Sequence, residues 1–364
     1  MWYESTNNVY GTTNNPYDLR RMVGGSSGGE GSLIAAAGAP VGLGSDIGGS
    51  IRMPAFFNGI WGLKPTGGVI PNEGQYPIAA NEGLRYMTTG PLCRYVDDVW
   101  PMFTVLADPY FDRGGDGDDD EPPITPKKFP DPAAFDLKSL EFISVTEINH
   151  PFVQGVSPDL LRLQTRVETF LQESVGAKRK HLAPGQLHAL KYSPDIWSSM
   201  LAAAGGKSFS LMCGDEKGEI RVWWEFLKFL VGRSPHTLMA IALAMFERLP
   251  EGIAPQKVRE HCRQGKALRE ELASLLGKNG VLLFPSHPTV ALPHHAPIFV
   301  PFNFAYTAIL NVLEIPVIQC PLGLDSQGLP VGIQVGALHG NEHVAVAVAR
   351  ELSKEFGGWV PPPI

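Results

Sequence analysis

The sequence predicts an α/β fold, in which strands and helices alternate along the chain and pack in layers. Three observations support this prediction. Short apolar runs typical of buried strands alternate with segments whose apolar residues recur at helical spacing. The 364 residues are 44% hydrophobic and 18% charged, which is enough for one large core or two smaller ones. The 40 glycines and 32 prolines predict many loops and tight turns.

The first hundred residues combine glycine- and serine-rich loops with short elements. Residues 30–37 predict a short helix of small side chains, which lets two backbones approach closely. Residues 39–43 predict a short buried strand that leads into a loop.

The elements that follow have clearer patterns. Ser157 and Pro158 are the expected N-cap and first residue of a helix, and Leu160, Leu163 and Val167 share its apolar face. The other expected elements are strands at 140–145, 281–284, 317–320 and 331–335, a helix at 255–276 that ends at Gly277, and a helix at 342–356.

Two segments differ from the rest of the chain. Residues 112–132 are acidic and rich in glycine and proline. They lack the ligand spacing of an EF-hand and predict a solvated surface insertion. Residues 222–249 are apolar, and a break at 232–235 divides them into two halves, each too short to span a bilayer.

The apolar segment at 222–249 has two readings. One is a buried helical hairpin. This is the more common case for such a segment. The other is a hairpin at a membrane interface, which needs features such as the paired Trp223 and Trp224 and the basic residues at its edges, and which the family resemblance given below favours. Those basic residues are Lys228, Arg233 and Arg248.

Charge and cysteine usage exclude several classes of protein. The net charge is −7, and no basic cluster is dense enough for a nucleic-acid interface. The N-terminus lacks the regions of a signal peptide, and no stretch is apolar enough for a spanning helix. Four separated cysteines without a C-x-x-C pair are typical of free thiols in a reducing compartment, so we expect an intracellular protein that is not secreted. They are Cys93, Cys213, Cys262 and Cys320.

The glycine-rich loops at 24–31 and 42–52 carry the strongest chemical signal. A P-loop needs G-x-x-x-x-G-K-[ST], but the first lysine of the chain is Lys64. A dinucleotide fingerprint G-x-G-x-x-G counted from Gly42 has Ile47 at its sixth position. Both nucleotide readings are therefore weak.

The second of these loops fits acyl transfer better. In D-I-G-G-S a serine, Ser50, follows two glycines, which let successive N–H groups point at one spot. Such a nest forms an oxyanion hole. Ser50 would be a nucleophile beside that hole, and Ser26 could relay its proton. Glycine–serine loops are also common as plain linkers, and the residues alone leave both readings open.

Longer stretches of the chain resemble a known family. The run GGSSGGEGSLIAAAGAPVGLGSDIGGSIRMPAFFNGIWGLKPT, with GLPVGIQ downstream, resembles the amidase signature family. WYES, NNPYDL, FPSHPTVA, PFNFAYTA and KEFGGWV resemble one branch of it, the fatty-acid amide hydrolases of the second type. The resemblance covers nearly the whole chain and is weakest in the acidic insertion. It implies a single domain over 1–364, with a mixed β-sheet covered by helices on both faces.

The resemblance also implies roles for the loop residues. The family uses a Ser-Ser-Lys unit, in which Ser50 is the nucleophile and Ser26 the bridging serine at a cis peptide. The oxyanion hole falls on the backbone N–H groups of Ile47, Gly48, Gly49 and Ser50 itself.

Ser27, Asp46 and Arg52 would support these loops. Ordinary hydrogen bonding in the core or at the surface explains these three residues nearly as well.

The chain departs from the family at the general base. That base is a lysine upstream of the glycine–serine motif, whereas no lysine here precedes Lys64, which has its own place in the family and is not the base. We therefore expect Met1 to be an internal methionine of a longer enzyme, with part of the N-terminal core and a membrane anchor upstream.

Three functions follow as hypotheses. The first is a serine amidase that hydrolyses fatty-acid amides to fatty acid and amine through an acyl-enzyme on Ser50. In it, 222–249 would dock to the membrane and admit the acyl chain, with Trp223, Trp224 and Phe226. The second is a non-catalytic truncated product without the lysine base. The third, an amidotransferase-type subunit, is disfavoured by the tryptophan-rich hairpin and by the lack of a basic face.

The expected partners are a lipid amide and a membrane surface, and a homodimer stays open. No cofactor or metal is expected. His287, His294 and His295 have no carboxylate or cysteine at ligand spacing and are expected to be loop residues near the pocket.

Overall fold

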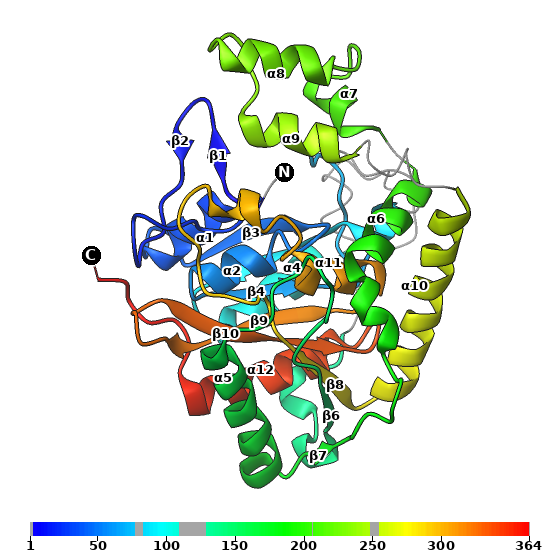
Figure 1. Ribbon diagram of the computed structural model, residues 1–364. Coiled ribbons are helices and arrows are strands. Elements are labelled where there is room, and N and C mark those ends of the chain that lie inside the picture. Colours follow the sequence, from blue (N-terminus) through cyan, green and yellow to red (C-terminus); the bar gives the residue numbers. More distant parts are fainter. Residues whose placement is uncertain (1–2, 77–82, 109–128, 206, 248–254, 364) are drawn as a thin grey trace, which may run out of the picture.

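A mixed eight-stranded sheet organises the molecule (Figure 1). The computed structural model describes residues 3–76, 83–108, 129–205, 207–247 and 255–363. All neighbouring strands are antiparallel except the last three, which are parallel. The α/β fold with a mixed sheet is therefore confirmed. In their order across the sheet, the strands are β3 (Val41–Asp46), β5 (Thr88–Cys93), β4 (Trp61–Lys64), β9 (Val317–Leu324), β10 (Pro330–Ala337), β8 (Gly280–Phe284), β6 (Glu141–Ser144) and β7 (Lys178–Arg179).

Helices cover both faces of this sheet. Those on one face are α1 (Gly28–Ala35), α2 (Arg52–Phe57), α6 (Ser193–Ala204), α10 (Pro255–Leu276) and α11 (Ala305–Val312). Those on the other face are α5 (Pro158–Phe170) and α12 (Glu342–Phe356). Two further helices, α3 (Gly83–Tyr86) and α4 (Val99–Leu106), flank β5 in the chain.

The elements with a continuous apolar pattern lie close to where the sequence places them. Strands β8 and β10 are buried along their whole length, which is why they read as apolar runs without alternation. Helix α10 has the expected bounds, and Gly277 follows it with a φ of 55°. Ser157 is the N-cap of α5, although its hydroxyl makes no capping hydrogen bond.

The glycine-rich region differs more from the expectation. The strand expected at 39–43 begins at Val41 and continues to Asp46, where it pairs with Thr88 of β5. The helix expected at 30–37 runs two residues earlier, over Gly28–Ala35. The expected acidic insertion at 112–132 lies almost entirely outside the described residues.

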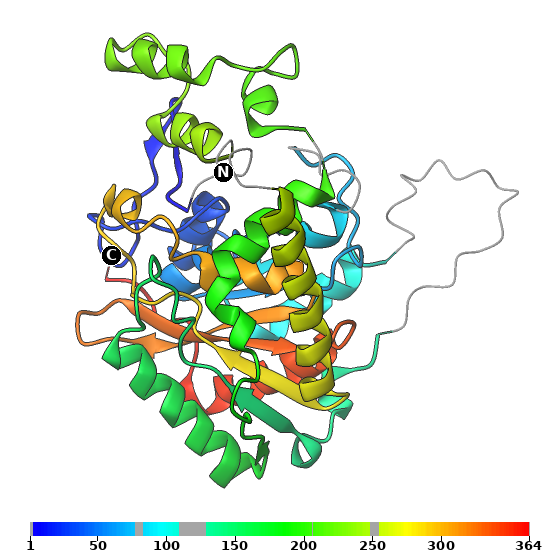
Figure 2. The same cartoon turned by 45° about the vertical axis from the view of Figure 1, so that its right-hand side comes forward.

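A small helical unit projects beyond these layers, as Figures 1 and 2 both show. It comprises α7 (Phe209–Cys213), α8 (Val222–Leu230) and α9 (Leu238–Glu247), so the expected helical hairpin is present over its described part. A separate apolar cluster around Val222, Ile241 and Ala244 holds it together. The short hairpin of β1 (Thr6–Asn7) and β2 (Gly11–Thr12) rises beside it, and Asn8 Nδ2 donates to the Pro235 carbonyl over 2.7 Å.

Candidate active site

The two serine loops meet at the ends of β3, α1 and α2. Ser50 lies in the turn between β3 and α2, and Ser26 lies just before α1. The backbone N–H of Ser27 donates to the Ser50 carbonyl over 3.3 Å, which joins the loops directly. The Gly25–Ser26 peptide bond is cis, as the resemblance implies for the bridging serine.

Asp46 holds the second loop through its carboxylate. The side chain is fully buried and accepts hydrogen bonds from the backbone N–H groups of Gly49 (2.7 Å) and Ile51 (3.1 Å). Arg52, also fully buried, forms an ion pair with it, with Nη2 2.9 Å from Oδ1 and Nε 3.0 Å from Oδ2. Burial opposes the charge on Asp46, but Arg52 and Asn311 outweigh it and lower the pKa to about 2. The carboxylate is therefore ionised at neutral pH.

The guanidinium of Arg52 extends this network to distant parts of the chain. Its Nη1 donates to Gln334 Oε1 over 2.8 Å, and its Nη2 donates to Asn311 Oδ1 over 2.6 Å. Ser27 has a weaker link, because its Oγ accepts from the Ser45 N–H at 3.4 Å. All three residues expected to support the loops thus contact them.

Three side chains from outside the motif bind successive backbone carbonyls of the loop. Asn311 Nδ2 donates to Asp46 O over 2.9 Å and Trp197 Nε1 donates to Ile47 O over 2.9 Å. Thr307 Oγ1 donates to Gly48 O over 2.8 Å. These carbonyls are therefore fixed toward α6 and α11.

The N–H groups of the same loop divide into two sets. The Gly49 N–H, which the resemblance places in the oxyanion hole, donates to Asp46 Oδ1 over 2.7 Å. Within the described part of the chain, the N–H groups of Ile47, Gly48 and Ser50 have no acceptor. The turn that carries Ser50 therefore keeps three backbone donors for which these residues provide no acceptor.

Only glycine fits at position 49, because a side chain there would be strained and would clash. Its φ is 118°, and a Cβ placed on it would lie 2.0 Å from Thr307 Oγ1. A Cβ on Gly48 would lie 3.3 Å from Cζ2 of Trp197. The two glycines of the motif thus allow α6 and α11 to pack against the loop.

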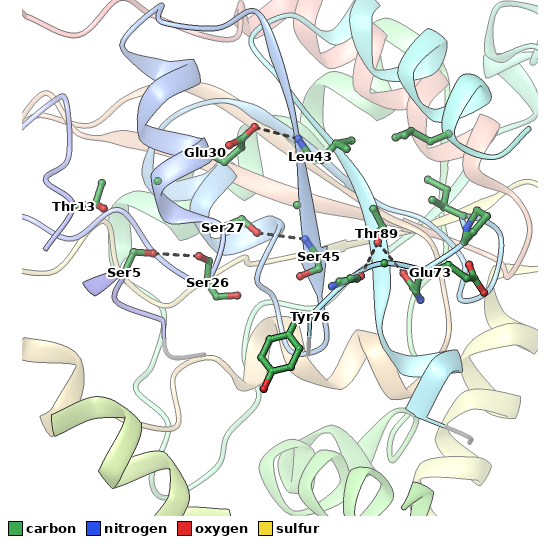
Figure 3. A pocket seen from close by; sticks show the side chains of 18 of the residues that line it. Ser5, Thr13, Ser26, Ser27, Glu30, Leu43, Ser45, Glu73, Tyr76 and Thr89 are labelled. Atoms are coloured by element: carbon green, nitrogen blue, oxygen red, sulfur yellow. Dashed lines mark hydrogen bonds between the residues drawn. The ribbon is translucent and has the colours of Figure 1, made fainter. Parts of the chain in front are cut away.

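An open hollow of about 990 Å³ adjoins the first loop. Ser26, Ser27 and Ser45 are among the residues that line it, and Figure 3 shows these serines with Ser5 in a row along it. Ser5 Oγ donates to the Gly24 carbonyl over 2.9 Å and accepts from the Gly28 N–H. The bridging serine expected from the sequence therefore borders an accessible space.

Lys64 is buried beneath the loops. Its Nζ donates to the Pro65 carbonyl over 3.0 Å. Burial and the nearby charge of Arg52 lower its pKa to about 7, against the opposing effect of Asp46 and two glutamates. Among the contacts of the described residues, none joins this amine to Ser26 or Ser50.

The expected membrane and acyl-channel residues separate into two environments. Trp223 and Trp224 are 73% and 59% exposed on α8. Phe226 is half-buried and packs against the apolar cluster of α8 and α9. None of the described helices is both long and apolar enough to cross a bilayer.

The three expected loop histidines differ in burial, and His295 is the exposed one, with 77% of its side chain accessible. His287 is fully buried, and burial lowers its pKa to about 4. His294 Nδ1 lies 2.9 Å from the buried Glu4 carboxylate. No three His, Cys, Asp or Glu side chains gather to hold a metal ion within the described ranges.

Comparison with known proteins shows which family and which relatives the chain resembles. The Amidase family model matches residues 1–346. Fatty-acid amide hydrolase 2 of Homo sapiens is 44% identical over 368 residues, and fatty-acid amide hydrolase 2-A of Danio rerio is 44% identical over 370 residues. These matches cover 100% of this chain but only 66% and 65% of the relatives, so the chain spans just under two thirds of their length.

Solved structures agree with the fold. The structure of 6-aminohexanoate cyclic dimer hydrolase has a TM-score of 0.72 at 20% identity, covering 100% of this chain and 74% of that one. With its mixed sheet, its two serine loops and the family match over most of its length, this chain belongs to the amidase signature family.

Proposed function

We propose that this chain carries the nucleophile and oxyanion hole of a serine amidase that hydrolyses fatty-acid amides. The loop between β3 and α2 carries the proposal. Its carbonyls are bonded to side chains of α6 and α11, and the N–H groups of Ile47, Gly48 and Ser50 remain as donors beside the Ser50 hydroxyl. Preorganised donors of this kind stabilise the charge that develops when an amide carbonyl is attacked.

The proposed reaction has two halves. Ser50 Oγ attacks the amide carbon and gives its proton to Ser26, which passes its own proton to the general base, and the carbonyl oxygen becomes an oxyanion at the loop donors. The C–N bond then breaks, the amine leaves with a proton from Ser26, and an acyl-enzyme remains on Ser50. Water attacks this ester and gives up one proton, which returns through Ser26 to Ser50 Oγ as the Ser50–acyl bond breaks, and the fatty acid is released. In the family that the chain resembles, the general base is a lysine upstream of the glycine–serine motif, and no lysine precedes Lys64 here.

The similarity to fatty-acid amide hydrolase 2 supports a lipid amide as the substrate. The exposed Trp223 and Trp224, with Leu227, Leu230 and Val231, support docking of α8 to a membrane surface. An amidotransferase-type subunit is not favoured, because the 44% identity is to fatty-acid amide hydrolases. A non-catalytic product is not favoured either, because the Ser50 loop keeps its buried Asp46–Arg52 support.

The test is hydrolysis of a long-chain and a short-chain acyl p-nitroanilide by the protein in its full natural length. We expect release of nitroaniline that is faster for the long acyl chain, and none with Ser50→Ala. Ser32→Ala, which changes a serine of α1 whose Oγ donates to the Asn14 carbonyl, is the matched control and retains activity. Equal hydrolysis by wild type and Ser50→Ala would refute the assignment.

A further inference from the structure

We infer that Trp197 is a positioning residue that orients the Gly48 N–H for the oxyanion. This inference rests on the proposed function. Trp197 lies on α6, about 150 residues from the loop, and its Nε1 donates to the Ile47 carbonyl over 2.9 Å. Its ring meets the ring of Phe304 edge to face, with centroids 5.0 Å apart, so the indole is held on both sides.

The geometry of the peptide bond connects this contact to the donor. The Ile47 carbonyl and the Gly48 N–H belong to one planar trans peptide and point in opposite directions. A hydrogen bond that fixes the carbonyl therefore also fixes the N–H. Trp197 is the partner of this carbonyl among the described residues.

The two neighbouring peptides are held in other ways. The peptide bonded by Thr307 has its N–H, that of Gly49, bound to Asp46 at its other end. The peptide bonded by Asn311 follows directly from β3, whose end is paired with β5. The peptide held by Trp197 lies between them, and its free N–H depends on the indole contact alone. Loss of this donor should therefore loosen Gly48 more than any other part of the loop.

Three variants test the inference. Trp197→Phe removes the donor and keeps an aromatic ring. Trp197→His restores a donor, because an imidazole carries Nε2 where the five-membered ring of tryptophan carries Nε1. Trp359→Phe is the matched control, since Trp359 Nε1 also donates to a backbone carbonyl, that of Ala35, over 3.0 Å at the opposite end of α1.

The probe is a long-chain alkyl fluorophosphonate. Ser50 Oγ bonds to phosphorus, the P–F bond breaks, fluoride leaves, and the serine proton goes to solvent, while the phosphoryl oxygen occupies the oxyanion hole. We measure the rate constant of labelling and, with the long-chain p-nitroanilide, kcat and KM. Thermal unfolding of each variant is followed in parallel.

We expect Trp197→Phe to lower the labelling rate and kcat by about 10- to 100-fold with little change in KM, because the donor is loosened rather than removed. Trp197→His should recover most of the rate, and Trp359→Phe should label like wild type. Unchanged labelling of Trp197→Phe, or no recovery in Trp197→His, overturns the inference. If Trp197→Phe does not fold, Trp197→Met, also without a donor, replaces it in the comparison.

Failure of the proposed function gives a different result. If Ser50→Ala is labelled as fast as wild type, or wild type is not labelled at all, the nucleophile assignment and the inference both fall. If labelling occurs on Ser50 and does not depend on residue 197, the inference alone falls.

Discussion

Gly49 offers the most direct test of how the loop is built. A Cβ at this position would lie 2.0 Å from Thr307 Oγ1 and 2.5 Å from Thr307 Cβ, and the residue has a φ of 118°. Forcing a side chain into a packed site costs about 1–3 kcal/mol. An L-residue in such a backbone region adds about 1–2 kcal/mol. We therefore expect Gly49→Ala to lower the free energy of unfolding by about 3 kcal/mol and to slow Ser50 labelling.

The measurement is urea unfolding. A control variant separates the cost of the backbone conformation from the cost of the clash between the new Cβ and Thr307. Gly176 has a φ of 80°, but a Cβ there would meet nothing within 4 Å. Gly176→Ala should therefore lose only about 1 kcal/mol, from the backbone term alone. Removing the obstacle in Gly49→Ala/Thr307→Ala should recover part of the loss. If Gly49→Ala costs no more than Gly176→Ala, the close packing of α11 on the loop is wrong.

Two further predictions concern Lys64 and the surface of α8. Burial lowers the pKa of Lys64 to about 7 in the folded protein, so above that pH the unfolded chain holds a proton that the folded chain lacks. The free energy of unfolding should therefore rise from about pH 7 to about pH 9, by at most about 1.4 kcal/mol per pH unit. In urea titrations across this range, Lys64→Met should lose that slope, and an identical slope in both proteins would contradict the pKa shift. Replacing Trp223 and Trp224 by serine should reduce binding to liposomes in a sedimentation assay, because both indoles are exposed on α8. Phe152→Ser, which changes a side chain that is 71% exposed elsewhere, is the control, and unchanged binding of the double tryptophan variant would refute the membrane proposal.

The sequence predicts those elements of the fold whose own side chains are continuously apolar. Strands β8 and β10 are such runs because both of their faces are buried. Strand β3 lies later in the chain than the sequence predicts, because the glycines within it resemble a loop. Gly44 is nevertheless required in the strand, since a Cβ there would lie 2.9 Å from Ile51 and 3.0 Å from Ser27 Oγ. Close tertiary packing, which local pattern does not show, decides this case.

The sequence likewise reveals the site residues that are close together in the chain but not those that reach the site from distant helices. Asp46, Ser50 and Arg52 are neighbours in the chain, so one motif reveals them together. Trp197 and Asn311 reach the loop from α6 and α11, and no local pattern connects them to it. The sequence of α11 does contain part of the information. Thr307 and Asn311 are polar residues four positions apart on one face of an otherwise apolar helix. That spacing indicates a buried polar surface but not the carbonyls it serves.

The carbonyl contacts from α6 and α11 have a consequence for the synthesis of the protein. The loop around Ser50 leaves the ribosome early, but its partners at 197, 307 and 311 are translated much later. Until α11 has emerged, these carbonyls lack the donors that fix them, and the nascent loop samples many backbone arrangements. On the proposed function, hydrolytic competence would therefore arise only after α11 has been translated, and a nascent chain that ends before α11 would be inert toward amides.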